Sequence, residues 1–474
     1  RDPEMSRGLG DVYKRQLFRG NAEYEIRKHI IRQGWIEGIV GLPANIFFGT
    51  GIPASIILIN KQGAADRKGI FFVDAKDGFV KDGNKNRLRE QDIKRIVDTW
   101  NARHDVPHYA KFVPISGENS IEANDYNLNI PRYIQPADTE ICQDIDAHLH
   151  GGIPKHDVEQ LSAYWTVCPS LRSALFDETA ERITLRTDKA TIANVIAADH
   201  SFIEQKNHFS RSIKAWCDNM RPLFRGLTTN IKPKALIEEW AQSLLDIMKE
   251  DKSLVDAYDA YQQLLTYWHD TLQDDCYIIS HDGWKPTLLR GTKKTATYED
   301  MVCDLLPVGI VLNEYFADEL EEIATITAER DEVAAELQAM IDVVLDESAE
   351  DDEDEIKALT DEVKKTKEYK AKDKVRKAID KRLKEKKAAL TEAVAAKYAA
   401  FTEAEVIDLV VEKKWIATIT TMIQSEMQQV TQRLTANIAA IVERYEQTLS
   451  VIDAEVSDLE AKVNSHLAKM GFSL

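Results

Sequence analysis

The chain has 474 residues, which is enough for two to four domains with substantial hydrophobic cores. Its five cysteines lie far apart and form no C-x-x-C pair, so the sequence indicates neither a disulfide framework nor a zinc ribbon. No run of about 18 apolar residues could span a bilayer, and no apolar stretch follows a positively charged start. We therefore expect a cytoplasmic protein without a membrane partner.

Charge is distributed unevenly along the chain. The formal net charge is -19, which argues against a nucleic-acid partner because a DNA surface needs Lys and Arg. Residues 17–135 carry 17 Lys and Arg against 14 Asp and Glu, whereas residues 136–474 carry 40 against 63. We expect any DNA contact in the mildly basic first part, while the acidic remainder either meets protein or only keeps the chain soluble.

Residues 1–16 do not resemble the start of a domain, because the stretch ending SRGLGDVYKRQ has no periodicity and no apolar face. We interpret them as a non-native scar of translated adapter sequence. The native protein is then expected to extend further upstream, so that residue 17 lies inside a fold.

Residues 17–135 predict the trailing half of a Rossmann-like α/β sheet. Apolar runs bounded by Gly and Pro are typical of buried strands, and a cap followed by acidic residues is typical of a helix start. The expected elements are a helix from Asn21 to Gly34, strands at 36–42, 54–60 and 69–75, a helix at 90–102 and a turn-rich stretch at 118–134.

Residues 136–310 predict a mixed, mainly helical domain without a recognisable catalytic pattern. Amphipathic stretches at 235–248 and 253–272 have a period near that of a helix. The segment CYIISHDGW at 276–284 predicts a short strand pair that interrupts the helices.

Residues 311–474 predict a long helical, coiled-coil arm for subunit assembly. Between Trp415 and Met470 apolar residues recur every 3.67 positions on average, which predicts one long helix that needs a partner helix. An acidic run at 346–355 and a lysine-rich run at 364–374 indicate a solvated joint between helical arms. That the lysines touch DNA is the less favoured interpretation, since alternating charge is most often a wet face.

The segment Gly38–Lys61 contains the most informative loop, a glycine-flanked turn with two adjacent phenylalanines between two strands. Ligands bind at the carboxyl edge of open α/β sheets, where such a loop would lie. The residues alone leave two interpretations open. The phenylalanines either pack as core beneath the loop, or one of them presents a face to a flat ligand.

Several segments together resemble the modification (M) subunit of Type I restriction-modification systems, an adenine-specific DNA methyltransferase. In that family an LP-x-N-[LI]-F-[FY]-x-TGIP loop belongs to the methyltransferase fold. The segments are GIVGLPANIFFGTGIPASIILINK, NAEYEIRKHIIRQG, FFVDAKDGF, NRLREQDIKRIVDTW and NDYNLNIPRYI, followed by VVEKKWIATI, RYEQTLSVIDAEV, LEAKV and HLAKMGF of the C-terminal arm.

The resemblance implies methyl transfer from S-adenosylmethionine to the N6 amino group of an adenine that is flipped out and stacked between aromatics. It implies that Phe48, or as second choice Phe47, stacks on this base. The residues implied to shape the pocket are Pro43, Asn45, Gly49, Thr50 and Gly51.

Two family motifs are missing: the [ND]-P-P-[FYW] tetrad that holds the amino group, and the glycine-rich strand-loop-helix that binds the methyl donor. We therefore expect no catalytic or cofactor-binding residue in this chain. We also expect that this polypeptide alone does not bind S-adenosylmethionine.

The implied partners are a specificity subunit that docks on the C-terminal helices, a second M subunit, a restriction subunit and double-stranded DNA. A rival interpretation is a non-catalytic coiled-coil scaffold that has kept part of an α/β fold. An ATP-driven or nuclease subunit would need a glycine-lysine phosphate loop or a clustered acidic-lysine site, and the sequence has neither.

The segment Asn124–Ile134 is interpreted mainly as an ordered turn, with direct DNA contact by Tyr126 or Arg132 as the alternative. Two histidine pairs, His104 with His108 and His148 with His150, are not expected to bind metal because no Cys or acidic partner stands at a fixed offset.

Overall fold

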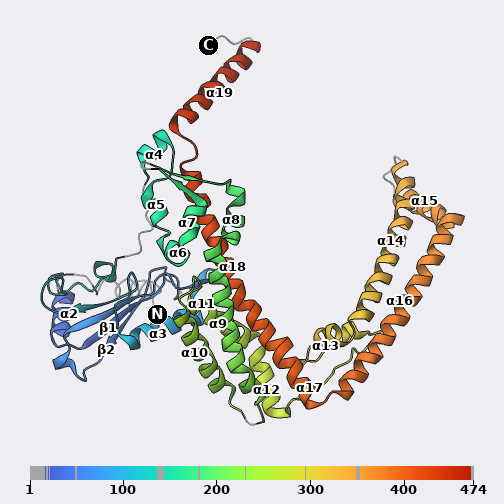
Figure 1. Ribbon diagram of the computed structural model, residues 1–474, viewed down its shortest axis with the longest axis horizontal. Coiled ribbons are helices and arrows are strands. Elements are labelled where there is room, and N and C mark those ends of the chain that lie inside the picture. The colour runs from blue at the N-terminus through green and yellow to red at the C-terminus, as the bar shows by residue number, and fades with distance from the viewer. Residues whose placement is uncertain are drawn as a thin grey trace, which may run out of the picture. The chain divides into compact units, whose positions relative to one another are not determined.

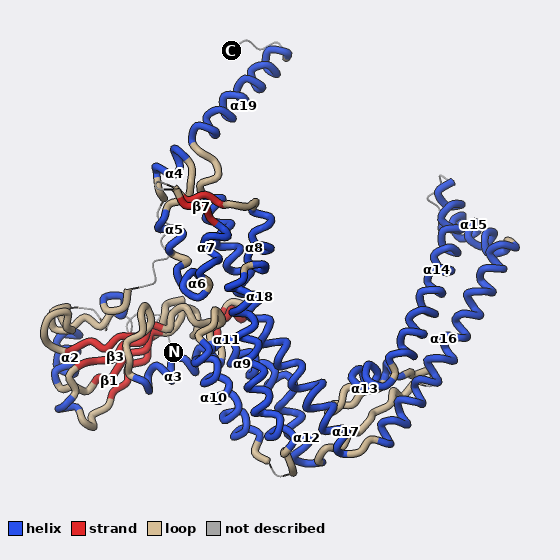
Figure 2. Tube along the Cα trace, in the orientation of Figure 1, coloured by secondary structure: helices blue, strands red, loops and turns tan. Residues whose placement is uncertain are grey.

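The computed structural model describes most of the chain, and helix predominates in it (Figure 2). The described residues are 17, 20, 22–47, 51–135, 143–179, 182–229, 231–293, 295–347 and 353–470. The predicted scar at 1–16 lies outside them. None of the described helices has the length and apolar character that crossing a bilayer requires.

The described chain forms two compact units that interleave in sequence. The first holds residues up to Ile213, Ala241–Thr266 and the part from Met422 onward, and the second holds Lys214–Trp240 and Tyr267–Thr421. The predicted boundaries near residues 135 and 310 stay a prediction.

The first unit contains a mixed sheet, short helices and the last helix of the chain. Its elements are α2 (Ala22–Arg32), β1 (Ile36–Gly41), β2 (Ser55–Ile59), β3 (Gly69–Asp74), β4 (Val80–Asp82), β5 (Lys85–Arg87), α3 (Glu90–Ala102), β6 (Ala110–Pro114), α4 (Ile145–His150), α5 (Lys155–Glu159), α6 (Ser162–Val167), α7 (Pro169–Leu175), β7 (Phe176–Glu178), β8 (Ile183–Leu185), α8 (Ile192–Ala198) and α19 (Leu449–Lys469).

The second unit is mainly helical, with an isolated β-bridge between Leu289 and Val302. Its elements are α12 (Gln273–Asp282), α13 (Val308–Tyr315), α14 (Ala317–Glu347), α15 (Glu353–Lys365), α16 (Lys367–Ala400), α17 (Glu403–Asp408) and the π-helical segments Trp268–Leu272 and Leu409–Ile416. The division between the units falls inside α9 (His200–Arg225), α10 (Pro233–Asp251), α11 (Ala257–Tyr267) and α18 (Ala417–Arg444).

The main sheet, in which Figure 1 labels β1 and β2, has the strand order β2-β1-β3-β6. β1 pairs with β3 in parallel, and the two outer pairs are antiparallel. The three strands expected from the sequence are confirmed, whereas β6 and the β4–β5 hairpin were not predicted. Every residue of β3 is buried, because side chains of both its faces pack into cores.

The predicted first helix is confirmed as α2, and its end has a clear physical cause. Gly34 has φ +64° and its N–H bonds back to the carbonyl of Ile31, while the N–H of Trp35 bonds to that of Ile30. This is the Schellman pattern, which needs a left-handed residue. A Cβ on Gly34 would also collide with the carbonyl of Ala64. The predicted cap, Asn21, lies outside the described residues.

The predicted strand pair at 276–284 is wrong, because most of this segment belongs to α12. Asp275, Cys276 and Ile279 form one buried helical face there. Burial of that face outweighs the preference of the Ile-Ile pair for strands, since tertiary packing commonly overrides local propensity.

The single long helix predicted from Trp415 to Met470 is also wrong, because α18 ends at Arg444 and α19 begins at Leu449. The buried stripe of α18 continues to Tyr445, whose ring lies 5.0 Å from that of His148. Beyond this anchor every described side chain from Leu449 to His466 is exposed. The apolar period continues through the break, so it did not reveal the break.

A buried ion pair lies at the centre of the second unit. Lys414 Nζ lies 2.7 Å from Asp275 Oδ2, and the two residues are only 7% and 2% exposed. Lys414 also donates to the carbonyls of Asp304 and Leu305, and the indole of Trp415 donates to Asp275. Burial raises the pKa of the Asp275 carboxyl, while Lys414 opposes that rise. Four hydrogen bonds from one buried pair thus join α12, the π-helical segment and the chain before α13.

We predict that Lys414→Met lowers the free energy of unfolding by about 3–5 kcal/mol, because it leaves a buried carboxylate without its cation. The matched control is Lys413→Met, since the exposed pair of Lys413 with Glu314 at 2.9 Å should contribute at most about 1 kcal/mol. Urea unfolding followed by circular dichroism measures both. Equal midpoints for the two variants would contradict the central role of the pair.

Candidate functional site

The candidate site is the loop Leu42–Ala54, which joins β1 to β2 at one edge of the sheet. Because β1 and β3 run parallel, their carboxyl ends, Gly41 and Asp74, meet at that edge. The N–H of Leu42 donates to the carbonyl of Ala54 at 2.8 Å and closes the base of the loop. Open α/β sheets bind ligands outside the carboxyl ends of their strands, so the loop borders the expected ligand position.

The β4–β5 hairpin holds this loop. Lys85 Nζ donates to the carbonyl of Phe47 at 2.7 Å, and Asn86 Nδ2 donates to that of Ala44 at 2.8 Å. The N–H of Asn86 donates to the carbonyl of Asn45 at 3.0 Å. Two hairpin residues thus satisfy three loop carbonyls. Sequence reasoning missed both, because nothing in the local pattern links the hairpin to a loop about 40 residues earlier.

The two hydrophobic residues at the tip of the described loop point in different directions. Ile46 packs against the core formed by Val40, Leu42, Phe71 and Val73, whereas Phe47 is 53% exposed. Phe47 is therefore not a core residue. Phe48, the first choice for the stacking ring, lies outside the described residues together with Gly49 and Thr50.

The remaining predicted pocket residues shape the backbone around that tip. Pro43 is buried two residues after the end of β1. Asn45 has φ +57°, a left-handed conformation that Asn tolerates better than most residues. A Cβ on Gly51 would lie 3.1 Å from Asn45 Oδ1. The structure thus brings Asn45 and Gly51 together across the loop.

The segment around Tyr126 is part of the core. Tyr126 is 4% exposed and has φ +52°. Its hydroxyl donates to Glu122 at 2.6 Å and accepts from Arg32 at 2.9 Å, while Arg27 donates to its carbonyl at 2.6 Å. Burial raises the pKa of the phenol. These contacts give Tyr126 a structural role that fastens this segment to α2.

Arg132 lies elsewhere, at an exposed position. It lines a hollow of about 530 Å³ together with Lys111, His108 and Asp105. His108 Nδ1 lies 3.1 Å from the carbonyl of Gln135 and Asp105 Oδ1 accepts from the N–H of Phe112 at 2.7 Å. Arg132 and Lys111 give this hollow two cationic groups, and Asp105 gives it a carboxylate. DNA contact by Arg132 stays a prediction.

Among the described residues, no group of three or more His, Cys, Asp or Glu is arranged to hold a metal ion. His148 Nε2 lies 2.6 Å from Gln143 Oε1, and His150 pairs with Asp146 at 2.9 Å.

Helix α3 connects the sheet to α10 and α11 within the first unit through polar contacts. Asp98 accepts from Lys249 at 2.9 Å, from Tyr258 at 3.0 Å and from Lys94 at 2.7 Å. Burial works to raise the pKa of Asp98, but these three donors outweigh it and the pKa is lowered. The carboxylate of Asp98 thereby fixes the helix behind the sheet.

Known proteins resemble the part of the chain that contains the main sheet and the candidate loop. Residues 12–141 match the family model described as N-6 DNA Methylase. The match begins at residue 12, inside the segment that the sequence predicted to be non-native. It includes all four strands of the main sheet and the whole loop between β1 and β2.

The similar proteins are methylase subunits. That of the Type I restriction enzyme MjaVII of Methanocaldococcus jannaschii is 36% identical over 134 residues, which are 27% of this chain and 22% of that protein. That of MpnII of Mycoplasma pneumoniae is 33% identical over 119 residues, 25% of this chain and 21% of that protein. A similar solved structure is the crystal structure of the type I restriction-modification methyltransferase subunit from Streptococcus thermophilus, which is 39% identical in sequence. The match covers 26% of this chain and 25% of that chain, with a TM-score of 0.23.

The matched segment thus spans about a fifth of the length of these curated relatives. Over residues 12–141 this chain therefore resembles the N-6 DNA methylase family as it occurs in the methylase subunits of Type I restriction enzymes.

Proposed function

We propose that this chain is part of the modification subunit of a Type I restriction-modification complex, which transfers a methyl group from S-adenosylmethionine to the N6 amino group of adenine in DNA. The observation that supports this most is the loop at the carboxyl edge of β1, which lies within the segment matched to the methylase family and exposes Phe47. The sheet is then the trailing half of a larger Rossmann-like methyltransferase sheet.

The proposed task of the loop is to receive the flipped adenine. An exocyclic amino group is a weak nucleophile because its lone pair is delocalised into the ring, so the base must be held in a fixed position beside the methyl donor. A ring of the Phe47-Phe48 pair would stack on the purine. The carbonyl contacts from Lys85 and Asn86 would keep the loop in place while the base enters.

We predict that Phe48→Ala, in a methylase assembled with this chain, lowers the rate of methyl transfer to duplex DNA by about tenfold or more, because stacking of a base on an aromatic ring contributes about 1–3 kcal/mol. Transfer of a labelled methyl group to a duplex with the recognition site measures this rate. Phe47→Ala tests the second choice in the same assay.

The control for both variants is Phe112→Ala. Phe112 is also exposed (46%), but it lies on β6, which is the edge strand on the opposite side of the sheet from β2. Its methylation rate should stay near that of the unsubstituted protein. Near-normal rates for both loop variants would refute the stacking assignment.

The methyl donor of the complete enzyme is proposed to be S-adenosylmethionine, as the N6 methyltransferase family implies. We predict that the 474-residue polypeptide alone shows no heat of binding when S-adenosylmethionine is titrated into it, because it lacks the donor loop and the [ND]-P-P-[FYW] tetrad. Saturable binding with micromolar affinity would overturn this prediction.

The proposed partner of the C-terminal helices is the specificity subunit, within a complex that also holds a second M subunit and a restriction subunit. The described side chains of α19 are almost all exposed, and five apolar ones recur at helical spacing on one face. They are Leu449, Ile452, Val456, Leu459 and Val463. An amphipathic helix with an uncovered apolar face is suited to packing against a helix of another chain.

We predict that the triple variant Ile452→Asp, Val456→Asp, Leu459→Asp no longer co-purifies with the specificity subunit, because charges at the centre of an apolar interface are costly to desolvate. Its own melting curve should be unchanged, since these side chains are already in solvent. Truncation from Trp415 would be less informative, because it also removes buried core residues such as Trp415 and Ile423.

The matched control places the same three charges on the opposite face of α19, at Ala454, Ala461 and Ser465. This variant should still bind. Binding by both variants would exclude the apolar face as the docking surface.

A further inference from the structure

Helices α14 and α16 form an antiparallel pair in the second unit (Figure 1). Ile326 and Leu337 of α14 and Leu383 and Leu390 of α16 are buried. Ion pairs join the helices along their length: Lys372 with Glu336 near one end, and Lys386 with Glu322 at 2.6 Å near the other. The pair is therefore held by an apolar seam with charges along its rim.

The two helices carry opposite charge. α14 has 11 Asp and Glu and one Arg, whereas residues 367–387 of α16 have 11 Lys and Arg and four Asp and Glu. Only part of the basic charge of α16 faces α14. Lys372, Arg382 and Lys386 make the contacts across the pair.

The other lysines form a stripe along the outside of α16, which we call the lysine stripe. Its members are Lys370, Lys374, Lys377, Lys381 and Lys384. The steps of four and three keep all five within about 40° of one line along the helix, on the side away from the seam residues, over a length of about 21 Å. All five are exposed.

The lysine stripe keeps most of its positive charge unmatched. Lys377 pairs with Asp373 at 2.7 Å and Lys381 lies 3.8 Å from Glu385. Lys370, Lys374 and Lys384 have no acidic partner within 4.0 Å among the residues that the structure describes. No large apolar side chain stands within the stripe, which distinguishes it from a protein interface, where the centre is apolar and Lys is depleted.

We propose that the lysine stripe binds the phosphodiester backbone of double-stranded DNA, independently of base sequence. Lysines act as point charges toward phosphates and need no planar geometry. Each phosphate that they neutralise releases condensed counterions, which favours binding. The acidic helix α14 would repel DNA from the opposite side of the pair, so the duplex can approach only the α16 side. This inference goes beyond the proposed methylation, because it needs neither a target base nor a methyl donor.

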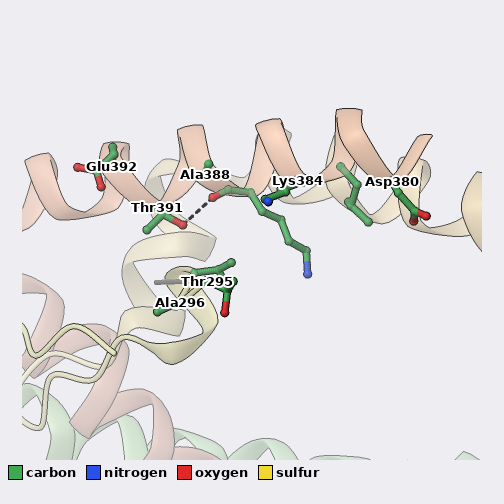
Figure 3. Close-up of a pocket in the computed structure, with 10 residues that line it drawn as sticks. Thr295, Ala296, Asp380, Lys384, Ala388, Thr391 and Glu392 are labelled. Carbon is green, nitrogen blue, oxygen red and sulfur yellow. Dashed lines mark hydrogen bonds between the residues drawn. The ribbon is translucent and has the colours of Figure 1, made fainter. Parts of the chain in front are cut away.

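Lys384, at one end of the stripe, also lines a hollow of about 420 Å³. Figure 3 shows Lys384 on α16 near the loop that carries Thr295 and Ala296, with Asp380 and Glu392 on the same helix. Thr391 donates to the carbonyl of Lys387 there at 2.6 Å. Because two carboxylates share this lining, we assign phosphate contact to the outer stripe and not to the hollow.

The test uses the full chain and a labelled duplex made only of G·C pairs, which has no adenine to capture. We expect the unsubstituted chain to bind it at about 50 mM salt, with an affinity that falls steeply as salt is added. The variant K370Q/K374Q/K377Q/K381Q/K384Q should bind about tenfold more weakly or worse. Its plot of log affinity against log salt should be shallower by about 0.9 for each phosphate that the variant no longer neutralises.

The matched control replaces five exposed lysines elsewhere by Gln, at Lys155, Lys206, Lys214, Lys232 and Lys234, and so changes the net charge equally. Circular dichroism should show unchanged helix content for both variants. The proposal is overturned if the unsubstituted chain does not bind the duplex. It is also overturned if the stripe variant binds the duplex equally well, which is the result expected if the lysine stripe binds an acidic protein instead of DNA. Equal weakening of the control variant and the stripe variant would overturn it as well. Because the duplex holds no adenine, failure of the adenine assignment leaves this result unchanged.

Discussion

The parallel pairing of β1 with β3 is the constraint on which the candidate site depends. Parallel strands end at the same edge, so Gly41 and Asp74 meet there, and the chain that follows each strand is brought to one place. The loop after β1 closes at Leu42 and Ala54, and the chain after β3 returns as a hairpin whose Lys85 and Asn86 bind the loop carbonyls. A different register of these two strands would separate the loop from its support.

Sequence reasoning found the elements whose pattern is local. The three strands and the helix at 90–102 follow from short apolar runs and from a 3.6-residue period. It failed where a distant contact decides the outcome. Burial of Cys276 and Ile279 made a helix of a segment rich in strand-forming residues. Helix α18 ends next to Tyr445, whose ring contacts that of His148, although the apolar period continues.

The candidate site shows the same division. Its place on a loop between two strands could be predicted, because glycine-flanked turns mark the ends of strands. The sequence could not predict which of the two neighbouring side chains faces solvent, because Ile46 and Phe47 are both hydrophobic. Only the core behind the loop decides that Ile46 points inward. Tyr126 illustrates the converse: a residue considered for DNA contact is held between α2 and its own turn.

The π-helical segment Leu409–Ile416 has a consequence for sequence change. Lys414 and its neighbour Trp415 both reach Asp275 from it, and a wider turn accommodates one more residue than an α-helix of equal length would. Deletion of a single residue there would remove the extra residue and restore regular α-helical winding, which would withdraw Lys414 or Trp415 from Asp275. Insertions and deletions in this chain should therefore be tolerated far better in its loops than in these eight residues.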